Sequence, residues 1–299
     1  MNARLAWEHD GGNWPNHAAS RFVSAAGFQW HVQIMGEGPA LLLLHGSGAS
    51  THSWRDLAPA LATHFTVIAL DLPGQGFTDA PPASGFSLSA MAQSIAALLH
   101  ELRVSPQLIV GHSAGAAIAV RMAIDGLVAP KTIIGLNAAL LPFKAATGPV
   151  YSALAKILAL NPLIPWAFSR YASGRGGVER LLQETGSRID ARGIALYRQL
   201  AGNSAHVGAT LHMMANWNLS ALERDLPRLK TPLHLLVGAK DRTIAPERAF
   251  DVRRLLPQTR VEQLPSLGHL AHEERPNEIA DRIVEIARAN AIPGAKPDA

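Results

Sequence analysis

The sequence contains no cysteine among its 299 residues. This absence excludes disulfide bonds, thiolate metal sites and a cysteine nucleophile. The 27 basic and 23 acidic residues leave a small net charge, and no run of basic residues is present, so we expect no nucleic-acid partner. No H-E-x-x-H pair occurs either, and we expect neither a metal site nor a cofactor.

Long uninterrupted apolar segments are also missing. The first 16 residues lack an apolar core of signal-peptide length, so we expect a cytoplasmic location. The most hydrophobic long stretch, residues 150–168, carries Lys156 and is broken by Pro162 and Pro165. A membrane span needs about 20 apolar residues with few charges. We therefore interpret this stretch as helices of a cap, a helical segment inserted into the main domain. Peripheral membrane contact through these helices stays open.

Short apolar segments alternate with helical patterns along most of the chain. Strand–helix alternation of this kind predicts a mostly parallel sheet that is covered by helices on both faces. A helix is expected at Ser89–Leu102, with Ser87 as its cap, and the first strands, which lack intervening helices, are expected to be antiparallel. The predicted strands are Trp30–Met35, Ala40–Leu44, Thr66–Leu70, Gln107–Val110, Thr132–Leu136, Leu233–Val237 and Arg260–Leu264.

The alternation stops within residues 137–228, where only helices and loops are expected. The simplest organisation is one α/β domain with an inserted helical cap. Residues 1–136 would form the first part of the core, with an N-terminal extension over 1–20. Residues 229–299 would complete the core.

The most informative motif is Gly111-His112-Ser113-Ala114-Gly115, which fits G-x-S-x-G. It follows the predicted strand Gln107–Val110 and precedes a small-residue helical stretch, Ala116–Ile124. Strand, sharp turn and helix are the setting of a nucleophile elbow. We therefore predict that Ser113 is the nucleophile of an acyl-transfer reaction.

A serine nucleophile needs a base and a group that orients the base. Asp241 and His269 each follow a predicted strand, which puts both at the carboxyl edge of the sheet. The order Ser113, Asp241, His269 is the order of the α/β-hydrolase triad. Asp241 could instead cap the helical segment 244–256, and His272 is the alternative base.

Two backbone amides are expected to stabilise the oxyanion. Ala114 follows the nucleophile, and its N–H is the first expected donor. The second is expected in the Gly-rich loop 45–50, where we assign Ser47 N–H and keep Gly48 as the fallback.

Four other polar residues lie near these motifs. We expect His45 to be a buried, hydrogen-bonded scaffold residue and His112 to shape the elbow while pointing away from the serine hydroxyl. Asp71 and Asp79 flank a turn-forming segment, which favours structural roles for both.

Taken together, the motifs resemble the α/β-hydrolase superfamily over nearly the whole chain. The resemblance implies the α/β-hydrolase fold and hydrolytic chemistry. The segments that carry it are LLLLHGSG at 41–48, ALDLPGQGFTD at 69–79, VGHSAG at 110–115, LLVGAKD at 235–241 and LGHLAHEERP at 267–276.

A second set of segments is similar to the magnesium-chelatase accessory proteins of bacteriochlorophyll biosynthesis. This resemblance implies a role in tetrapyrrole pigment synthesis in a photosynthetic bacterium and contact with magnesium-chelatase subunits. It does not imply chelation by this chain, because no G-x-x-x-x-G-K-[ST] loop is present. The segments are WEHDGGNWPNHAASRFV at 7–23, STHSWRDLAP at 50–59, RMAIDGLVAP at 121–130, LNAALLPF at 136–143 and MMANWNL at 213–219.

The cap region is rich in apolar side chains, which predicts a bulky apolar substrate such as a tetrapyrrole ester. We therefore expect a serine hydrolase that acts on an ester. A non-catalytic protein that binds a pigment intermediate or a chelatase subunit, and a carbon–carbon bond hydrolase, stay open. The expected substrate-binding residues are Trp54, Leu140, Phe143, Trp166, Met213 and Trp217.

Overall fold

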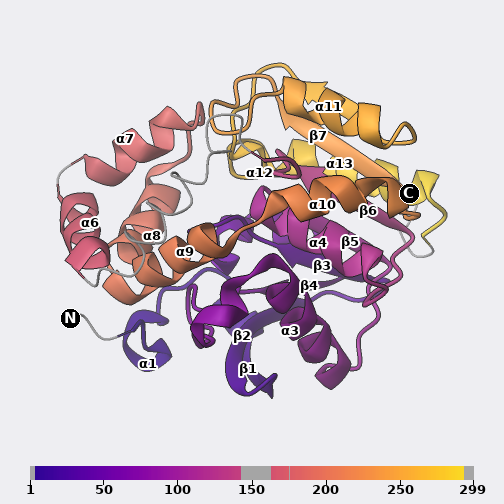
Figure 1. Ribbon diagram of the computed structural model, residues 1–299. Coiled ribbons are helices and arrows are strands. Elements are labelled where there is room, and N and C mark those ends of the chain that lie inside the picture. The colour runs from indigo at the N-terminus through magenta and orange to yellow at the C-terminus, as the bar shows by residue number, and fades with distance from the viewer. Residues whose placement is uncertain (1–3, 143–162, 175, 293–299) are drawn as a thin grey trace.

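An eight-stranded sheet forms the centre of the computed structural model, which describes residues 4–142, 163–174 and 176–292. Its strand order is β1-β2-β4-β3-β5-β6-β7-β8 (Figure 1). Seven strands agree with the predicted ones to within two residues at each end. The strands are β1 (Ser20–Ala25), β2 (Phe28–Met35), β3 (Ala40–Leu44), β4 (Thr66–Leu70), β5 (Leu108–His112), β6 (Thr132–Leu136), β7 (Leu233–Gly238) and β8 (Arg260–Leu264).

The sheet is antiparallel at one end and parallel elsewhere. Strand β2 pairs antiparallel with β1 and with β4, whereas β3 pairs parallel with β4 and β5. The expectation that all of the first strands are antiparallel is therefore wrong for β3. Strand β1 was not expected from the sequence, because none of its side chains is fully buried and no alternation of apolar residues marks it.

Helices cover both faces of the sheet, and successive strand residues face opposite layers. Leu42 and Leu44 pack in one apolar cluster with α3 (Leu88–Glu101), α4 (Ala114–Ile124), α10 (Leu219–Asp225) and α11 (Glu247–Leu255). Leu41 and Leu43 pack in the other, with α2 (Leu57–Leu61), α12 (Ala271–Glu274) and α13 (Pro276–Ala289). The predicted doubly covered sheet is confirmed.

Helix α3 begins where the sequence predicts. The side chain of Ser87 accepts a hydrogen bond from Ala90 N at 3.3 Å, which satisfies one free amide of the first turn. Shorter helices connect the larger elements: α1 (Trp7–Asp10), η1 (His17–Ala19), η2 (Thr51–Trp54), η3 (Ala83–Phe86) and η5 (Leu226–Arg228).

Between β6 and β7, the described part of the chain contains helices and no strand. Helices α6 (Leu163–Ser173), α7 (Gly177–Glu184), α8 (Ala191–Ala201) and α9 (Ser204–Asn216) lie together to one side of the sheet, and α10 lies across α4 (Figure 1). Helix α10 thus packs on the core although it lies within the predicted cap. The division of the chain at residues 136 and 228 stays a prediction.

Buried polar contacts join α8 to the core. Arg55 pairs with Glu273 and also with Asp190, the residue that caps α8. Tyr197, on α8, donates its hydroxyl to Glu273 Oε1 at 2.7 Å. Ion pairs and a hydrogen bond therefore hold α8 against the core segment that follows His269.

Within the described ranges, no helix is both long and apolar enough to cross a bilayer.

Candidate active site

Ser113 lies at a sharp turn between β5 and α4. Its φ of 49° is in the left-handed region, which a serine occupies only when the surroundings enforce it. Ser113 N donates to Leu136 O at 3.0 Å, and Ser113 O accepts from Ala139 N at 3.1 Å. The half-buried serine is thus fixed on both sides by the residues that follow β6.

Two glycines make this turn possible. A Cβ on Gly115 would collide with the carbonyl oxygen of Leu44, and one on Gly46 would lie 2.7 Å from the His112 ring and 3.2 Å from Ser113 Cβ. The start of α4 and the loop after β3 therefore approach each other at backbone distance. This approach brings Ser113 next to the predicted oxyanion loop.

Asp241 and His269 lie side by side at the carboxyl edge of the sheet. Their contact joins His269 Nδ1 to Asp241 Oδ2 at 2.8 Å, and the two residues are only 6% and 5% exposed. Asp241 Oδ1 also accepts from Thr243 N at 2.7 Å and from Ile244 N at 2.9 Å. One carboxylate oxygen thus faces His269 and the other accepts from a turn; Asp241 does not cap a helix, because α11 begins only at Glu247, after Pro246.

Asn137 is part of this arrangement and was missed from the sequence. Its Nδ2 donates to Asp241 Oδ2 at 2.7 Å and to Gly268 O at 2.9 Å, and its Oδ1 accepts from Gly238 N at 3.2 Å. The amide therefore orients the carboxylate that faces His269. Its place directly after β6, at the same edge as the other two loops, was the signal that could have found it.

A turn before α8 also touches both loops. Thr185 O accepts from Arg242 N at 3.1 Å and from His269 N at 3.4 Å, and Ser187 Oγ accepts from Leu270 N at 2.8 Å. Gly186, at φ +83°, fits here because a Cβ would collide with the carbonyl of Lys240. The helical region thus helps to fix the spacing of Asp241 and His269.

The Ser113 hydroxyl makes no hydrogen bond to the residues that the structure describes. Its backbone is bonded to Leu136, whose neighbour Asn137 is bonded to Asp241. The three predicted residues therefore converge on one edge of the sheet from three separate loops. Catalytic hydrogen bonds are often long before substrate binds.

His112 and His272 lie behind this group. His112 Nε2 donates to His269 O at 3.0 Å, and its ring lies 4.5 Å from the ring of His272. Burial lowers the pKa of His272 to about 3 and that of His112 well below its ordinary value. His272 packs against Trp54 rather than Asp241, so the structure favours His269 over His272 as the partner of the acid.

Of the backbone amides considered as oxyanion donors, one already has a hydrogen-bond acceptor and two do not. Gly48 N donates to Gln75 Oε1 at 2.8 Å, so this fallback donor is already engaged. Within the described residues, neither Ser47 N nor Ala114 N, at the first position of α4, has a hydrogen-bond acceptor. A positive helix end adds to the attraction of the Ala114 amide for negative charge.

His45 is a fully buried scaffold residue, as expected. Its Nδ1–H donates to Gly46 O at 2.8 Å, and its Nε2 accepts from Leu72 N at 2.8 Å. Burial lowers its pKa, which keeps the ring neutral. The tautomer is therefore fixed by its two neighbours, and the ring ties the oxyanion loop to the loop after β4.

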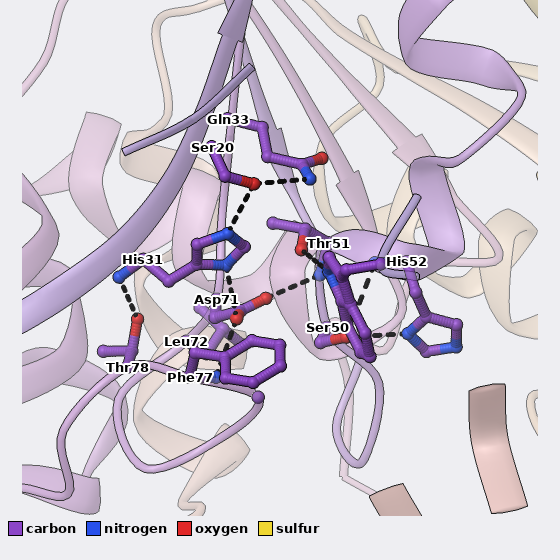
Figure 2. A network of polar contacts seen from close by, with 12 residues as sticks. Ser20, His31, Gln33, Ser50, Thr51, His52, Asp71, Leu72, Phe77 and Thr78 are labelled. Carbon is purple, nitrogen blue, oxygen red and sulfur yellow. Dashed lines mark hydrogen bonds and ion pairs between the residues drawn. The ribbon is translucent and has the colours of Figure 1, made fainter. Parts of the chain in front are cut away.

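Asp71 is the centre of a separate polar network, drawn in Figure 2. Its Oδ2 accepts from His31 Nδ1 at 2.8 Å and Phe77 N at 2.9 Å, and its Oδ1 accepts from Thr51 N at 2.7 Å. His31 Nε2 in turn accepts from the Ser20 hydroxyl at 2.9 Å. Asp71 thus joins strand β2 to the loops after β3 and β4, which agrees with its expected structural role.

Asp79 also has structural contacts. Its Oδ2 accepts from Gln29 N at 2.7 Å, and its Oδ1 pairs with Arg4. It ties the N-terminal segment to the loop after β4, as its position in the turn-forming segment suggested.

The predicted substrate-binding residues divide into three groups. Trp54, expected to bind substrate, is instead fully buried in the second core cluster, because the helical turn Thr51–Trp54 points it inward. Leu140 and Met213 pack in the first cluster with almost no exposed surface. Trp166 is 49% exposed and Trp217 half-buried, and their ligand contacts stay predictions. Phe143 lies outside the described residues.

No group of three or more acidic or histidine side chains suited to a metal ion occurs within residues 4–142, 163–174 and 176–292. The chemistry available at this edge is that of a serine hydroxyl, a histidine–carboxylate pair and free amides.

Comparison with known proteins identifies the family of this chain. The family model of the alpha/beta hydrolase family matches residues 41–282. The magnesium-chelatase 30 kDa subunit of Rhodobacter capsulatus is 38% identical over 275 residues, which are 91% of this chain and 96% of that protein. Both resemblances inferred from the sequence motifs are confirmed.

Two more distant matches extend the picture. The pimeloyl-[acyl-carrier protein] methyl ester esterase of Vibrio vulnificus is 27% identical over 86% of this chain and 97% of that protein. An alpha/beta hydrolase fold protein from Burkholderia ambifaria superposes with a TM-score of 0.74 at 22% identity, over 89% of this chain and 97% of the other. The second match shows the fold alone.

Proposed function

This chain belongs to the alpha/beta hydrolase family, and from that premise we propose that it is a serine hydrolase that cleaves an ester bond in a bulky apolar substrate. The observation that carries the proposal is the 2.8 Å contact between His269 Nδ1 and Asp241 Oδ2, at the edge of the sheet where Ser113 occupies its strained turn. The contact leaves His269 Nε2 to serve as the base.

In the proposed reaction, Ser113 Oγ attacks the ester carbonyl carbon while His269 Nε2 takes the hydroxyl proton. The amides of Ser47 and Ala114 donate to the oxyanion that forms. His269 then gives its proton to the departing alkoxide, which leaves as an alcohol. A water molecule, deprotonated by His269, attacks the acyl-enzyme and releases the acid and the free serine. Asp241 stabilises the imidazolium in each half of the cycle.

The second candidate function is that of a binding protein in the same pathway. The name of the Rhodobacter capsulatus relative, a magnesium-chelatase subunit, favours it, because a subunit can act by holding a partner or a tetrapyrrole intermediate. With either function we propose a place in bacteriochlorophyll synthesis, contact with chelatase subunits, and a cytoplasmic location with peripheral membrane contact; a tetrapyrrole substrate belongs to the hydrolase proposal.

Hydrolysis of p-nitrophenyl esters of increasing acyl length by the wild type and by Ser113→Ala tests the catalytic proposal. We expect turnover by the wild type alone. Turnover that persists in the variant would contradict it. Vinylogous diketones, assayed in parallel, would reveal a carbon–carbon bond hydrolase by faster turnover than the esters.

Complementation separates catalysis from binding. A deletion strain that carries the Ser113→Ala gene should fail to restore pigment synthesis if turnover is needed. Full restoration by the variant would favour the binding protein.

A further inference from the structure

His206, on α9, lies between two loops of the core. Its Nδ1 accepts from Gly76 N at 3.1 Å, and its Nε2 donates to Gly48 O at 3.2 Å. The side chain is almost completely buried, and Asn203 caps the helix just before it by accepting from His206 N at 3.0 Å. The ring therefore bridges the loop after β4 and the predicted oxyanion loop.

The two bonds require one particular form of the ring. A neutral imidazole offers one donor and one acceptor, and these two partners need an acceptor at Nδ1 and a donor at Nε2. Burial lowers the pKa of His206 to about 4, so the ring stays neutral near pH 7.

Gly48 is held at both of its backbone polar groups. Its carbonyl accepts from His206, and its N–H donates to Gln75 Oε1 at 2.8 Å. Gln75 Nε2 in turn lies 3.1 Å from Met213 Sδ. A side chain on Gly48, which has φ +79°, would meet Thr210 at 3.4 Å.

The three contacting residues of α9 are His206, Thr210 and Met213, at positions i, i+4 and i+7. Residues at this spacing share one face of a helix. One face of α9 thus packs against Gly48 and Gln75. The residue before Gly48 is Ser47, whose amide has no acceptor within the described residues.

We propose that His206 is a positioning residue that holds the oxyanion loop, so that the Ser47 amide stays aimed at the reacting carbonyl. The role rests on the proposed serine hydrolase function. It adds that stabilisation of the transition state depends on contacts made by α9. A 1 Å displacement of a catalytic donor can cost about 10²-fold in rate. Loss of one oxyanion donor costs about 10²–10³-fold.

Two substitutions test the two hydrogen bonds of the His206 side chain one at a time. In His206→Gln, the side-chain amide nitrogen can reach the place of Nε2 and donate to Gly48. In His206→Asn, the side-chain oxygen can take the place of Nδ1 and accept from Gly76, but nothing reaches Gly48. If the bond to Gly48 matters, only the first variant keeps the wild-type rate.

The experiment is steady-state hydrolysis of p-nitrophenyl butyrate. We expect His206→Asn to lower kcat by about 10–100-fold with KM within about twofold, and His206→Gln to stay within about fivefold of the wild type in kcat. His212→Asn is the matched control, since His212 lies on the same helix and stacks on Phe86 at 5.6 Å. It should leave kcat unchanged.

The rate at which a fluorophosphonate labels Ser113 provides the second readout, and it reports only on folded enzyme. The inference would be overturned if His206→Asn kept the kcat and the labelling rate of the wild type. It would also be overturned if kcat fell equally in both His206 variants. In either case the hydrolase proposal would stand. Absence of both turnover and labelling in the wild type would remove the proposed function itself, and the positioning role with it.

Discussion

Two groups in this protein contain a serine, a histidine and an aspartate, and they differ in almost everything else. In one, His269 Nδ1 contacts Asp241 Oδ2 at 2.8 Å; in the other, His31 Nδ1 contacts Asp71 Oδ2 at the same distance. Only the second has a complete chain of hydrogen bonds, because Ser20 donates to His31. Judged by side-chain contacts alone, the second group would be the better triad.

Backbone context distinguishes the two groups. Ser113 sits in a strained turn at the start of α4, beside amides that lack acceptors. Ser20 begins an edge strand with an ordinary extended conformation, and its hydroxyl also accepts from Gln33 Nε2 at 3.1 Å. His31 is completely buried among aromatic rings, so a substrate has no route to it. The comparison teaches that a serine, a histidine and an aspartate joined by hydrogen bonds are not by themselves evidence of a catalytic site.

The largest expected difference lies in the two serines. Ser113→Ala should lower kcat for p-nitrophenyl butyrate by about 10⁶-fold, because the nucleophile is removed. Ser20→Ala should leave kcat within about twofold and lower the free energy of unfolding by about 2 kcal/mol, because the hydrogen bonds to His31 and from Gln33 are both lost. Kinetics and urea unfolding on both variants measure this, and a similar loss of activity in both would break the comparison.

The two aspartates should differ in which property they control. Asp241→Asn should lower kcat by about 10⁴-fold, since an amide no longer stabilises the imidazolium or fixes its tautomer. Thermal unfolding should show that the variant remains folded. A kcat within tenfold of the wild type would argue that His269 acts without its partner.

Asp71→Asn should act on stability instead. Asp71 accepts from His31 and from two backbone amides, and the amide nitrogen of asparagine would replace one acceptor oxygen, which leaves a buried donor unpaired at a cost of about 1–3 kcal/mol. We expect the urea midpoint to fall below that of the wild type, while the specific activity of the folded fraction, unlike that of Asp241→Asn, is kept to within about tenfold. A loss of specific activity as large as that of Asp241→Asn would show that the two pairs are not specialised.

The smallest expected effect is in the pH dependence of stability. His31 and its other donors lower the pKa of Asp71 to about 2, although burial alone would raise it. Because the folded pKa lies below the unfolded one, the stabilisation is complete above about pH 4 and is lost as the pH falls towards 2. Between pH 5 and pH 3, the wild type should lose about 1 kcal/mol more than Asp71→Asn. Urea unfolding at both pH values measures this difference. An equal loss of unfolding free energy in the wild type and in Asp71→Asn would contradict the prediction.

Much of the fold was predictable from the sequence because the parallel strands are buried on both faces and read as continuous apolar segments. Strands β3, β4 and β6, which have this pattern, begin and end at the predicted residues. Strand β8 was also predicted, although only Leu264 in it is buried, whereas in β1 no side chain is fully buried and no regular alternation marks the strand.

The candidate site was predictable where a motif follows a strand. The pairing of Asp241 with His269 could be inferred from strand order, whereas for Asn137 the sequence offers only its place directly after a strand, and its contacts with Asp241 and Gly268 appear only in the folded chain. Trp54 was misplaced because its position next to the oxyanion loop does not tell which way a short helical turn points it. His206 lies 158 residues from Gly48 in sequence, and only the folded chain brings them together.

Covalent labelling tests the central claim most directly, because it asks which serine the fold activates. A fluorophosphonate probe should add to the wild type once, with peptide mapping placing it on Ser113, and should add equally to Ser20→Ala but not to Ser113→Ala. A label on Ser20, or no label on a folded wild-type protein, would contradict the account.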